Sequence, residues 1–198
     1  MRQQWAAAAA LATFWCAEAW QCSTDVALGP VAIAGQKGLA LDDNSMRGCP
    51  WRLPASWPNT GTDGKGATPI NSLRLFKAWD RNWQERQRLP VWESLRDFVA
   101  SHGAKIFIGS PVTCDSKADE QDWTWVKKLI QMLGKDQVMG VAIGNELDIL
   151  WQKDSTSSAC VHSLWEEGRY WGEFQRRVKE LDSLGLGSVP VTAVFTGN

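Results

Sequence analysis

The sequence predicts an α/β fold with a parallel sheet. Segments with strand-like patterns alternate with longer segments whose apolar residues recur at helical spacing. Residues 138–143 (VMGVAI) form a nearly continuous apolar run, which is typical of a parallel strand covered on both faces. The intervals between the later predicted strands are long enough for right-handed crossover helices. The 198 residues suit one domain, whereas a closed (β/α)8 barrel needs about 250 residues.

The composition excludes several classes of protein. Hydrophobic residues make up 44% and charged residues 22% of the chain, which excludes wholesale disorder. The net charge of −1 gives no reason to expect a nucleic acid or an acidic membrane as partner. There are two histidines and no CxxC pair, so we expect no metal site and no cofactor. The unusual feature is 13 Trp against one Tyr.

Residues 1–19 are predicted to be a secretory signal peptide. Arg2 supplies the positive charge, residues 5–15 a short apolar run, and residues 17–19 (AEA) a small-x-small cleavage pattern. The run is too short to span a bilayer as a mature helix. This division leaves residues 20–37 as an N-terminal segment before a domain at 38–198, in a protein that is secreted or lumenal. The alternative is an Ala-rich helix that stays on the protein.

The cysteines agree with secretion. Once Cys16 is removed with the signal peptide, an even number remains, which suits disulfides in an oxidising compartment. The remaining cysteines are Cys22, Cys49, Cys114 and Cys160. These four cysteines can form two disulfides in three ways, and the sequence does not choose among them.

The first strands are predicted at residues 38–41 and 72–78. Residues 38–41 (GLAL) form a short apolar run, and residues 72–78 (SLRLFKA) alternate, with Leu73 and Leu75 on one face. The intervening residues 44–69 are rich in Pro, Gly, Asn and Thr without periodicity, which predicts a loop.

A helix is predicted to begin at Pro90, which suits a first turn, and to end at Gly103. His102 is therefore expected to be a C-terminal helix residue and not a catalyst. Residues 105–109 (KIFIG) predict a short buried strand. The next helix is predicted to have Asp119 as its cap and Gly134 at its end. Its apolar stripe comprises Trp123, Val126, Ile130 and Leu133.

After the strand at residues 138–143, a third helix is predicted with Ser163 as its cap and Gly185 after its end. Its apolar face comprises Trp171, Phe174, Val178 and Leu181. Residues 189–195 (VPVTAVF) predict the last strand.

Functional residues are expected at the carboxyl ends of the strands, where sites form in parallel α/β folds. Glu146 follows six apolar residues and so leaves a dry strand at the edge of the sheet. Partial desolvation favours the protonated form of a carboxyl group, as a general acid requires. Asn145 beside it can donate to a substrate hydroxyl, and Gly144 allows the backbone to turn. The alternative is that Glu146 lies in the first turn of a helix and Asn145 is its cap.

The tryptophans divide into two groups. Sugar rings stack on aromatic rings, and Trp offers the largest face. The candidates for such platforms lie at strand ends or in loops and are Trp51, Trp57, Trp79 and Trp151. These tryptophans could either contact the substrate or pack within the loops, and the sequence favours neither role. Trp123, Trp165 and Trp171 fit helix stripes and are predicted to be core, while Trp83 and Trp92 are undecided.

Residues 138–150 (VMGVAIGNELDIL) resemble the fourth strand of the (β/α)8 glycoside hydrolases that carry Asn-Glu at its end. Within that group the chain most resembles the endo-β-1,3-glucanases of glycoside hydrolase family 17. Further segments are similar, in order, to the first, second, third and fifth strands of this family. They are residues 38–51, 73–80, 102–111 and 185–196.

The resemblance implies a partial (β/α)8 barrel, about its first five strands, in a secreted or cell-wall retaining hydrolase or transglycosylase. Its partner would be a β-glucan. Glu146 would be the general acid/base and Asn145 would bind a sugar hydroxyl beside the scissile bond. In the family the nucleophilic Glu lies on a strand far beyond the fifth, and no residue of this sequence is assigned to that position. Further candidate substrate-binding residues are chosen because they lie at strand ends or could stack on a sugar ring. They are Trp79, Asp80, Thr113, Trp151 and Thr192.

An incomplete barrel would expose its last strand at Thr192 and Val194. Three explanations would account for an incomplete barrel: a truncated product, a half-barrel that dimerises, or a degenerate protein that only binds sugar. We favour the truncated product. The main functional alternative is a secreted carbohydrate-binding protein without catalysis. A flavodoxin-like or Rossmann domain is a weaker possibility, because the glycines at 185–187 precede a strand and do not follow one.

Overall fold

The computed structural model describes residues 37–41, 46, 53–54, 56–58, 67–152 and 157–195. The predicted signal peptide, Cys22, Cys49 and Trp51 lie outside the described residues. The strands are β1 (Lys37–Leu41), β2 (Ser56–Pro58), β3 (Ala67–Leu75), β4 (Lys105–Ser110), β5 (Val138–Ile143) and β6 (Val191–Thr192). The helices are α2 (Glu85–His102), α3 (Ser116–Leu133), α4 (Ser158–Trp165) and α5 (Arg169–Ser183), with short 3-10 helices η1 (Lys135–Gln137) and η2 (Leu147–Gln152).

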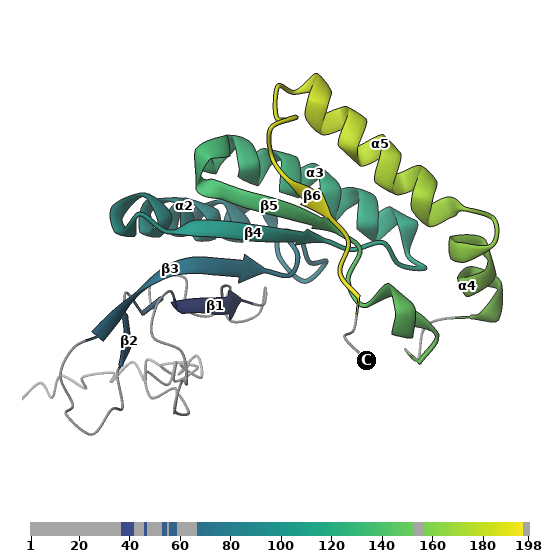
Figure 1. Cartoon of the computed structure of the whole chain (residues 1–198), viewed down its shortest axis with the longest axis horizontal. Coiled ribbons are helices and arrows are strands. Elements are labelled where there is room, and N and C mark those ends of the chain that lie inside the picture. The colour runs from purple at the N-terminus through teal and green to yellow at the C-terminus, as the bar shows by residue number, and fades with distance from the viewer. Residues whose placement is uncertain are drawn as a thin grey trace, which may run out of the picture.

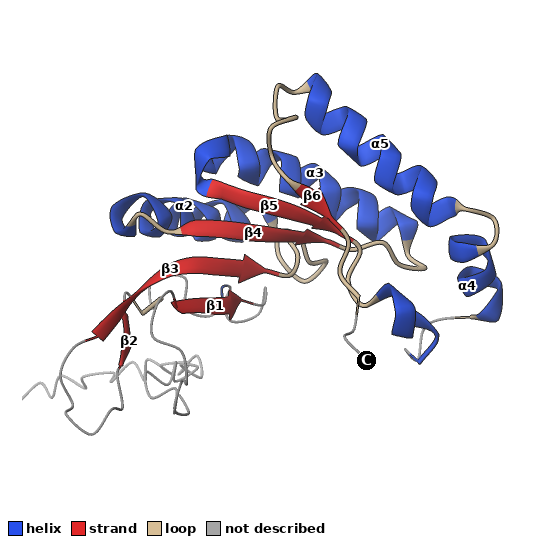
Figure 2. Ribbon diagram, in the orientation of Figure 1, coloured by secondary structure: helices blue, strands red, loops and turns tan. Residues whose placement is uncertain are grey.

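The fold is α/β, as predicted, with five parallel strands in the order β1-β3-β4-β5-β6. The short β2 pairs antiparallel with the beginning of β3. Spatial order follows chain order without a reversal. Figure 1 shows α2 and α3 behind the strands and α5 beyond them, beside β6. Among the described helices, none lies in front of β3, β4 and β5 (Figure 2).

The two faces of the sheet differ sharply in burial. One face packs under the helices, and its side chains are almost completely buried. They include Leu73, Leu75, Ile106, Ile108, Val141 and Ile143. The register places Arg74 beside Phe107 on the opposite face, where both are only partly buried. Burying one Leu or Ile side chain stabilises by about 1.5–3 kcal/mol, so the covered face supplies the main core of the domain.

The first helix begins earlier than predicted. α2 begins at Glu85, and a capping box between Gln84 and Gln87 satisfies its first amide groups. Pro90 therefore lies inside the helix and not in its first turn. The prediction was wrong because a Gln cap is not one of the usual Ser, Thr, Asp or Asn signals.

Two predicted helix ends are confirmed. Gly103 follows α2 in the left-handed conformation, with φ of 60°, and the Gly134 amide closes α3 on the Ile130 carbonyl. His102 is in the last turn of α2, as predicted, and its ring stacks on Phe98 with centroids 4.3 Å apart.

The predicted cap of α3 was wrong. Asp115 is the N-cap, and its carboxylate accepts a hydrogen bond from the Ala118 amide at 3.0 Å. Asp119 lies one turn later and is buried. The predicted apolar stripe is confirmed by the burial of Trp123, Val126, Ile130 and Leu133.

The third predicted helix is two helices. Ser157 caps α4, Ser163 lies within it, and Gly168 separates it from α5 with φ of 73°. Leu181 is buried, as predicted. Trp165 and Trp171 are 41% and 57% exposed, which contradicts their prediction as core residues. Periodicity identifies an apolar face but not the presence of a neighbour that covers it.

Other strand boundaries also differ. The predicted loop at 44–69 contains β2 and the first residues of β3, and the predicted last strand at 189–195 is paired only at Val191–Thr192. Trp83 and Trp92, undecided from the sequence, are both buried and stack with ring centroids 5.7 Å apart.

A disulfide joins Cys114 in the β4–α3 loop to Cys160 in α4. This selects one bond from the pairings that the sequence left open. In the part of the chain that the structure describes, no helix has the length and apolar character needed to cross a membrane.

Candidate functional site

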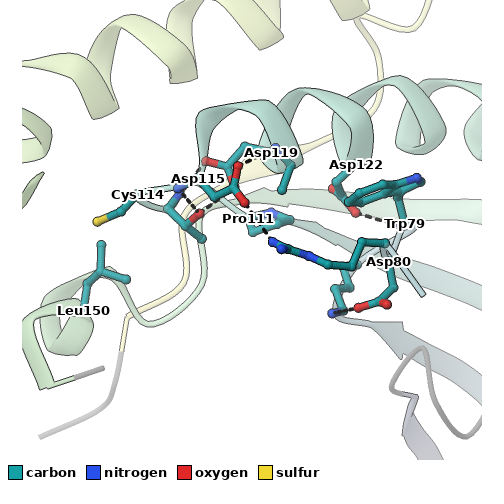
Figure 3. A pocket seen from close by; sticks show the side chains of 12 residues that line it. Trp79, Asp80, Pro111, Cys114, Asp115, Asp119, Asp122 and Leu150 are labelled. Carbon is teal, nitrogen blue, oxygen red and sulfur yellow. Dashed lines mark hydrogen bonds and ion pairs between the residues drawn. The ribbon is translucent and has the colours of Figure 1, made fainter. Parts of the chain in front are cut away.

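A cleft of about 450 Å³ opens at the carboxyl ends of β3 and β4, beside the beginning of α3. Its walls are the β3–α2 loop and the β4–α3 loop (Figure 3). Three predicted substrate-binding residues, Trp79, Asp80 and Thr113, line it. The other lining residues are Lys77, Arg81, Pro111, Cys114, Asp115, Ala118, Asp119, Asp122 and Leu150.

The remaining candidate residues lie apart from the lining of this cleft. Asn145 and Glu146 follow β5 at the same edge of the sheet, and both are half-buried. Trp151 belongs to η2, directly after the lining residue Leu150, and its side chain is outside the described part. Thr192 is exposed on β6. The structure therefore groups three of the seven candidates in the cleft and places two at the adjacent strand end.

The backbone turns sharply where it leaves β5. The Gly144 amide donates to the Ser110 carbonyl at 2.8 Å, and Gly144 has φ of 87°. Glu146 has φ of 50°, the only positive φ of a residue other than glycine in the described residues. Its amide donates to the Val194 carbonyl at 3.0 Å. A left-handed conformation costs a non-glycine residue about 1 kcal/mol or more, and such residues cluster at functional sites.

The Asn145 side chain is fixed from across the sheet. The Arg74 guanidinium, on β3, donates to Asn145 Oδ1 at 2.9 Å, although β4 lies between their strands. A guanidinium only donates hydrogen bonds, so this contact assigns Oδ1 as the acceptor and orients Nδ2 as a donor. Arg74 is itself placed over the Phe76 ring, 4.6 Å from its centroid.

Asp122 lines the cleft and holds the wall that carries Trp79. Its Oδ1 accepts from the Ala78 amide at 2.7 Å and from the Trp79 amide at 3.0 Å, and its Oδ2 accepts from Ser110 Oγ at 2.9 Å. Burial raises the pKa of Asp122 to about 7, against the opposing effects of these hydrogen bonds and of Arg177.

The network continues from Asp122 into α5. Arg177 is 1% exposed, and its NH1 group donates to Ser110 Oγ at 2.8 Å and to the Pro111 carbonyl at 3.0 Å. Its guanidinium also lies over the Trp123 ring, 5.3 Å from the centroid. Burial lowers the pKa of Arg177, and Asp122 opposes that shift. A buried chain of side chains therefore connects α3, the end of β4 and α5.

The opposite wall is held in a similar way by Asp119. Its carboxylate accepts from the Thr113 amide at 2.6 Å and from Thr113 Oγ1 at 2.9 Å, and burial raises its pKa. Arg169 of α5 donates to the Thr113 carbonyl at 2.9 Å. The Cys114–Cys160 disulfide fixes the next residue of this wall.

Charges at the cleft mouth are paired with one another. Lys77 Nζ lies 2.8 Å from Asp80 Oδ2 within one wall. Arg81 Nη2 lies 2.8 Å from Asp115 Oδ2, and this ion pair connects the two walls. Each cation of the cleft lining therefore has a carboxylate partner. In the described residues no group of three His, Cys, Asp or Glu side chains is arranged to hold a metal.

Asp119, Asp122 and Arg177 were not predicted from the sequence as residues of the site. A signal for two of them was present, because Asp119 and Asp122 fall in register with the buried stripe that continues at Val126. An acidic residue on an apolar helix face has to find partners inside the protein.

No family model matches this chain, and none of the curated proteins is significantly similar to it.

Proposed function

We propose that this chain carries the acid/base part of the active site of a secreted retaining β-1,3-glucan hydrolase or transglycosylase, similar to glycoside hydrolase family 17. The observation that carries the proposal is the position of Asn145 and Glu146. They lie at the carboxyl end of β5, the fourth strand of the parallel sheet, and Arg74 fixes the Asn145 amide. The resemblance gives both residues their roles at that position.

The topology supports a partial (β/α)8 barrel. In a doubly wound sheet the strand order reverses, and helices cover both faces. Here the order follows the chain, and the face with Arg74 and Phe107 has no helix in front of it among the described ones. In the proposed barrel that face would line the interior, and α2, α3 and α5 would form part of the outer ring.

The proposed chemistry needs two carboxyl groups. In a retaining glycosidase one carboxylic acid protonates the leaving oxygen, and a carboxylate about 5–5.5 Å away attacks the anomeric carbon. We assign the first role to Glu146. Asn145 Nδ2 donates to the sugar hydroxyl beside the scissile bond. None of the carboxylates of these 198 residues is assigned the second role, so we expect the chain alone to give no detectable hydrolysis of laminarin, a β-1,3-glucan.

The cleft supports a carbohydrate ligand. Trp79 offers an aromatic face, while Asp80 and Thr113 offer polar groups within the same cleft. The pairing of Lys77 with Asp80 and of Arg81 with Asp115 makes the cleft compatible with an uncharged chain of sugars. The disulfide is compatible with the proposed secretion.

The proposal is tested by calorimetric titration of the chain with laminarihexaose, using cellohexaose as the control with a different linkage. We expect saturable binding of laminarihexaose that Asn145→Ala weakens about tenfold, the effect of losing one buried hydrogen bond. Asp136→Ala, on exposed η1, is the matched control and should bind as the wild type does. Absence of saturable binding, or equal binding by Asn145→Ala, would contradict the proposal.

One observation favours the alternative of a carbohydrate-binding protein without catalysis: Glu146 is not among the residues that line the cleft. The alternative predicts that Glu146→Gln leaves laminarihexaose affinity and every activity unchanged. Any laminarin turnover by the wild type that Glu146→Gln abolishes would refute it. Such turnover would also show that a nucleophile is present in these 198 residues.

A further inference from the structure

The cleft wall that carries Trp79 is an irregular segment. Residues between Leu75, the last of β3, and Glu85, the first of α2, form bends and turns without a ladder of backbone hydrogen bonds. The Ala78 and Trp79 amides donate to a side chain, Asp122 Oδ1, at 2.7 and 3.0 Å. The position of Trp79 in the cleft therefore depends on a residue 43 positions later in the chain.

Asp122 is itself fixed from two further elements. Ser110 at the end of β4 donates to its other oxygen, and Arg177 of α5 donates to Ser110 Oγ. Asp122 is 1% exposed. Both of its carboxylate oxygens are directed to donors of the protein, and Figure 3 shows it next to Trp79. It therefore acts on a ligand only through the segment that it holds.

We propose that Asp122 is the positioning residue of the cleft, which sets Trp79 through the two backbone amides so that its ring receives a neutral, polyhydroxylated ligand. The choice of a sugar as that ligand rests on the proposed function. The positioning itself rests only on the hydrogen bonds and burial described above.

Substitutions of Asp122 separate positioning from simple packing. Asparagine keeps an Oδ1 acceptor for both amides, and its Nδ2 can donate to Ser110 Oγ, so Asp122→Asn should preserve the loop. Asp122→Ala removes the acceptor. Asp122→Leu also removes the acceptor but keeps a side chain of similar volume. It replaces the alanine variant in the experiment if that variant does not fold. Ser110 and Arg177 remain unchanged in all three.

The experiment measures amide hydrogen exchange by NMR in the ligand-free protein and laminarihexaose affinity by calorimetry. In Asp122→Ala or Asp122→Leu, we expect exchange at Ala78 and Trp79 to rise at least about tenfold, while the β4 amides, which exchange through global unfolding, remain the slower set, and the Kd to rise about tenfold. In Asp122→Asn both quantities should stay within about threefold of wild type.

The outcomes separate the two proposals. If wild type binds the sugar, and a folded Asp122→Ala or Asp122→Leu shows unchanged exchange at both amides or unchanged Kd, the positioning role is wrong. If Asp122→Asn is as impaired as those variants, the role of the Oδ1 acceptor is also wrong. If wild type does not bind laminarihexaose but the two amides exchange faster in the variants, the proposed sugar ligand fails and Asp122 remains the anchor of the Trp79 segment.

Discussion

The two sides of the carboxyl edge of the sheet are held in place by different means. On the β3–β4 side, buried carboxylates bind the loops: Asp122 holds Ala78 and Trp79, and Asp119 holds Thr113. On the β5–β6 side, main-chain hydrogen bonds of Gly144 and Glu146 hold the turn that presents Glu146. The first side depends on the chemistry of single side chains, whereas the turn at Glu146 on the second side depends on backbone geometry, with Arg74 holding the Asn145 side chain.

In the proposed enzyme this difference separates the cleft with Trp79 from the strand end with the acid/base residue Glu146. The side with Trp79 is connected to α3 and α5 by a buried network within the described residues. The side with Glu146 rests on a residue at φ of 50° and on β6, which pairs with β5 over two residues. Substitutions should therefore have large effects on stability on the first side and small ones on the second.

The largest expected effect is that of Asp122→Ala. The substitution leaves the Ala78 and Trp79 amides without an acceptor and removes the carboxylate that favours buried Arg177, so the free energy of unfolding should fall by about 3 kcal/mol. Urea denaturation followed by circular dichroism measures it. Asp136→Ala, an acidic-to-alanine change at an exposed site, should stay within about 0.5 kcal/mol of wild type. A loss below about 1 kcal/mol for Asp122→Ala would show that the network contributes little.

A comparable effect is expected from loss of the disulfide. The double variant Cys114→Ser, Cys160→Ser opens a loop closed over a separation of 46 residues, which should cost about 2–4 kcal/mol in unfolding free energy. Hydrogen exchange should increase at Thr113 and Cys160 and remain unchanged at Ala78, since Asp122 holds the other wall. Equal increases at both walls would contradict the independence of the two anchors.

A further effect of Asp122 is expected in the pH dependence of stability. The native pKa of Asp122, about 7, exceeds its ordinary value of 3.8, so the folded protein binds more protons than the unfolded chain between these values. The contribution of Asp122 is therefore most favourable below pH 4 and is lost as pH rises through 7. Arg177 and Arg88 favour the charged form of Asp122 and so limit the loss of stability as the pH rises.

Urea titrations of wild type and Asp122→Asn from pH 4 to pH 7.5 isolate this contribution, because the variant cannot titrate at this site. The stability of Asp122→Asn relative to wild type should increase with pH across this interval. A difference that is constant with pH would show that Asp122 has an ordinary pKa.

The smallest effect concerns the turn after β5. Glu146→Gly should relieve the positive φ and raise the free energy of unfolding by about 0.5 kcal/mol, whereas Glu146→Gln should leave it unchanged. Thermal denaturation of the two variants side by side measures the difference. A glycine variant less stable than the glutamine variant would show that the conformation of Glu146 is not strained.

The sequence identified those features that periodicity encodes. The VMGVAI strand, the buried stripe from Trp123 to Leu133 and the location of Glu146 at a strand end follow from local patterns. Asp122 was missed because its partners are distant: the Ala78 amide is 44 residues away, and Arg177 reaches the network through Ser110, 67 residues before it. Trp171 was misplaced because whether a neighbour covers a helix face is a property of tertiary packing.

We propose that Asn145 and Glu146 mark a β-1,3-glucan site at the carboxyl end of β5. The most direct test is an NMR titration of the isotopically labelled chain with laminarihexaose that follows the Asn145 side-chain amide and the Glu146 backbone amide. We predict saturable shifts of both signals with laminarihexaose, weaker shifts with cellohexaose, and loss of the Glu146 response in Asn145→Ala. Unchanged Asn145 and Glu146 signals at saturating laminarihexaose would contradict the claim.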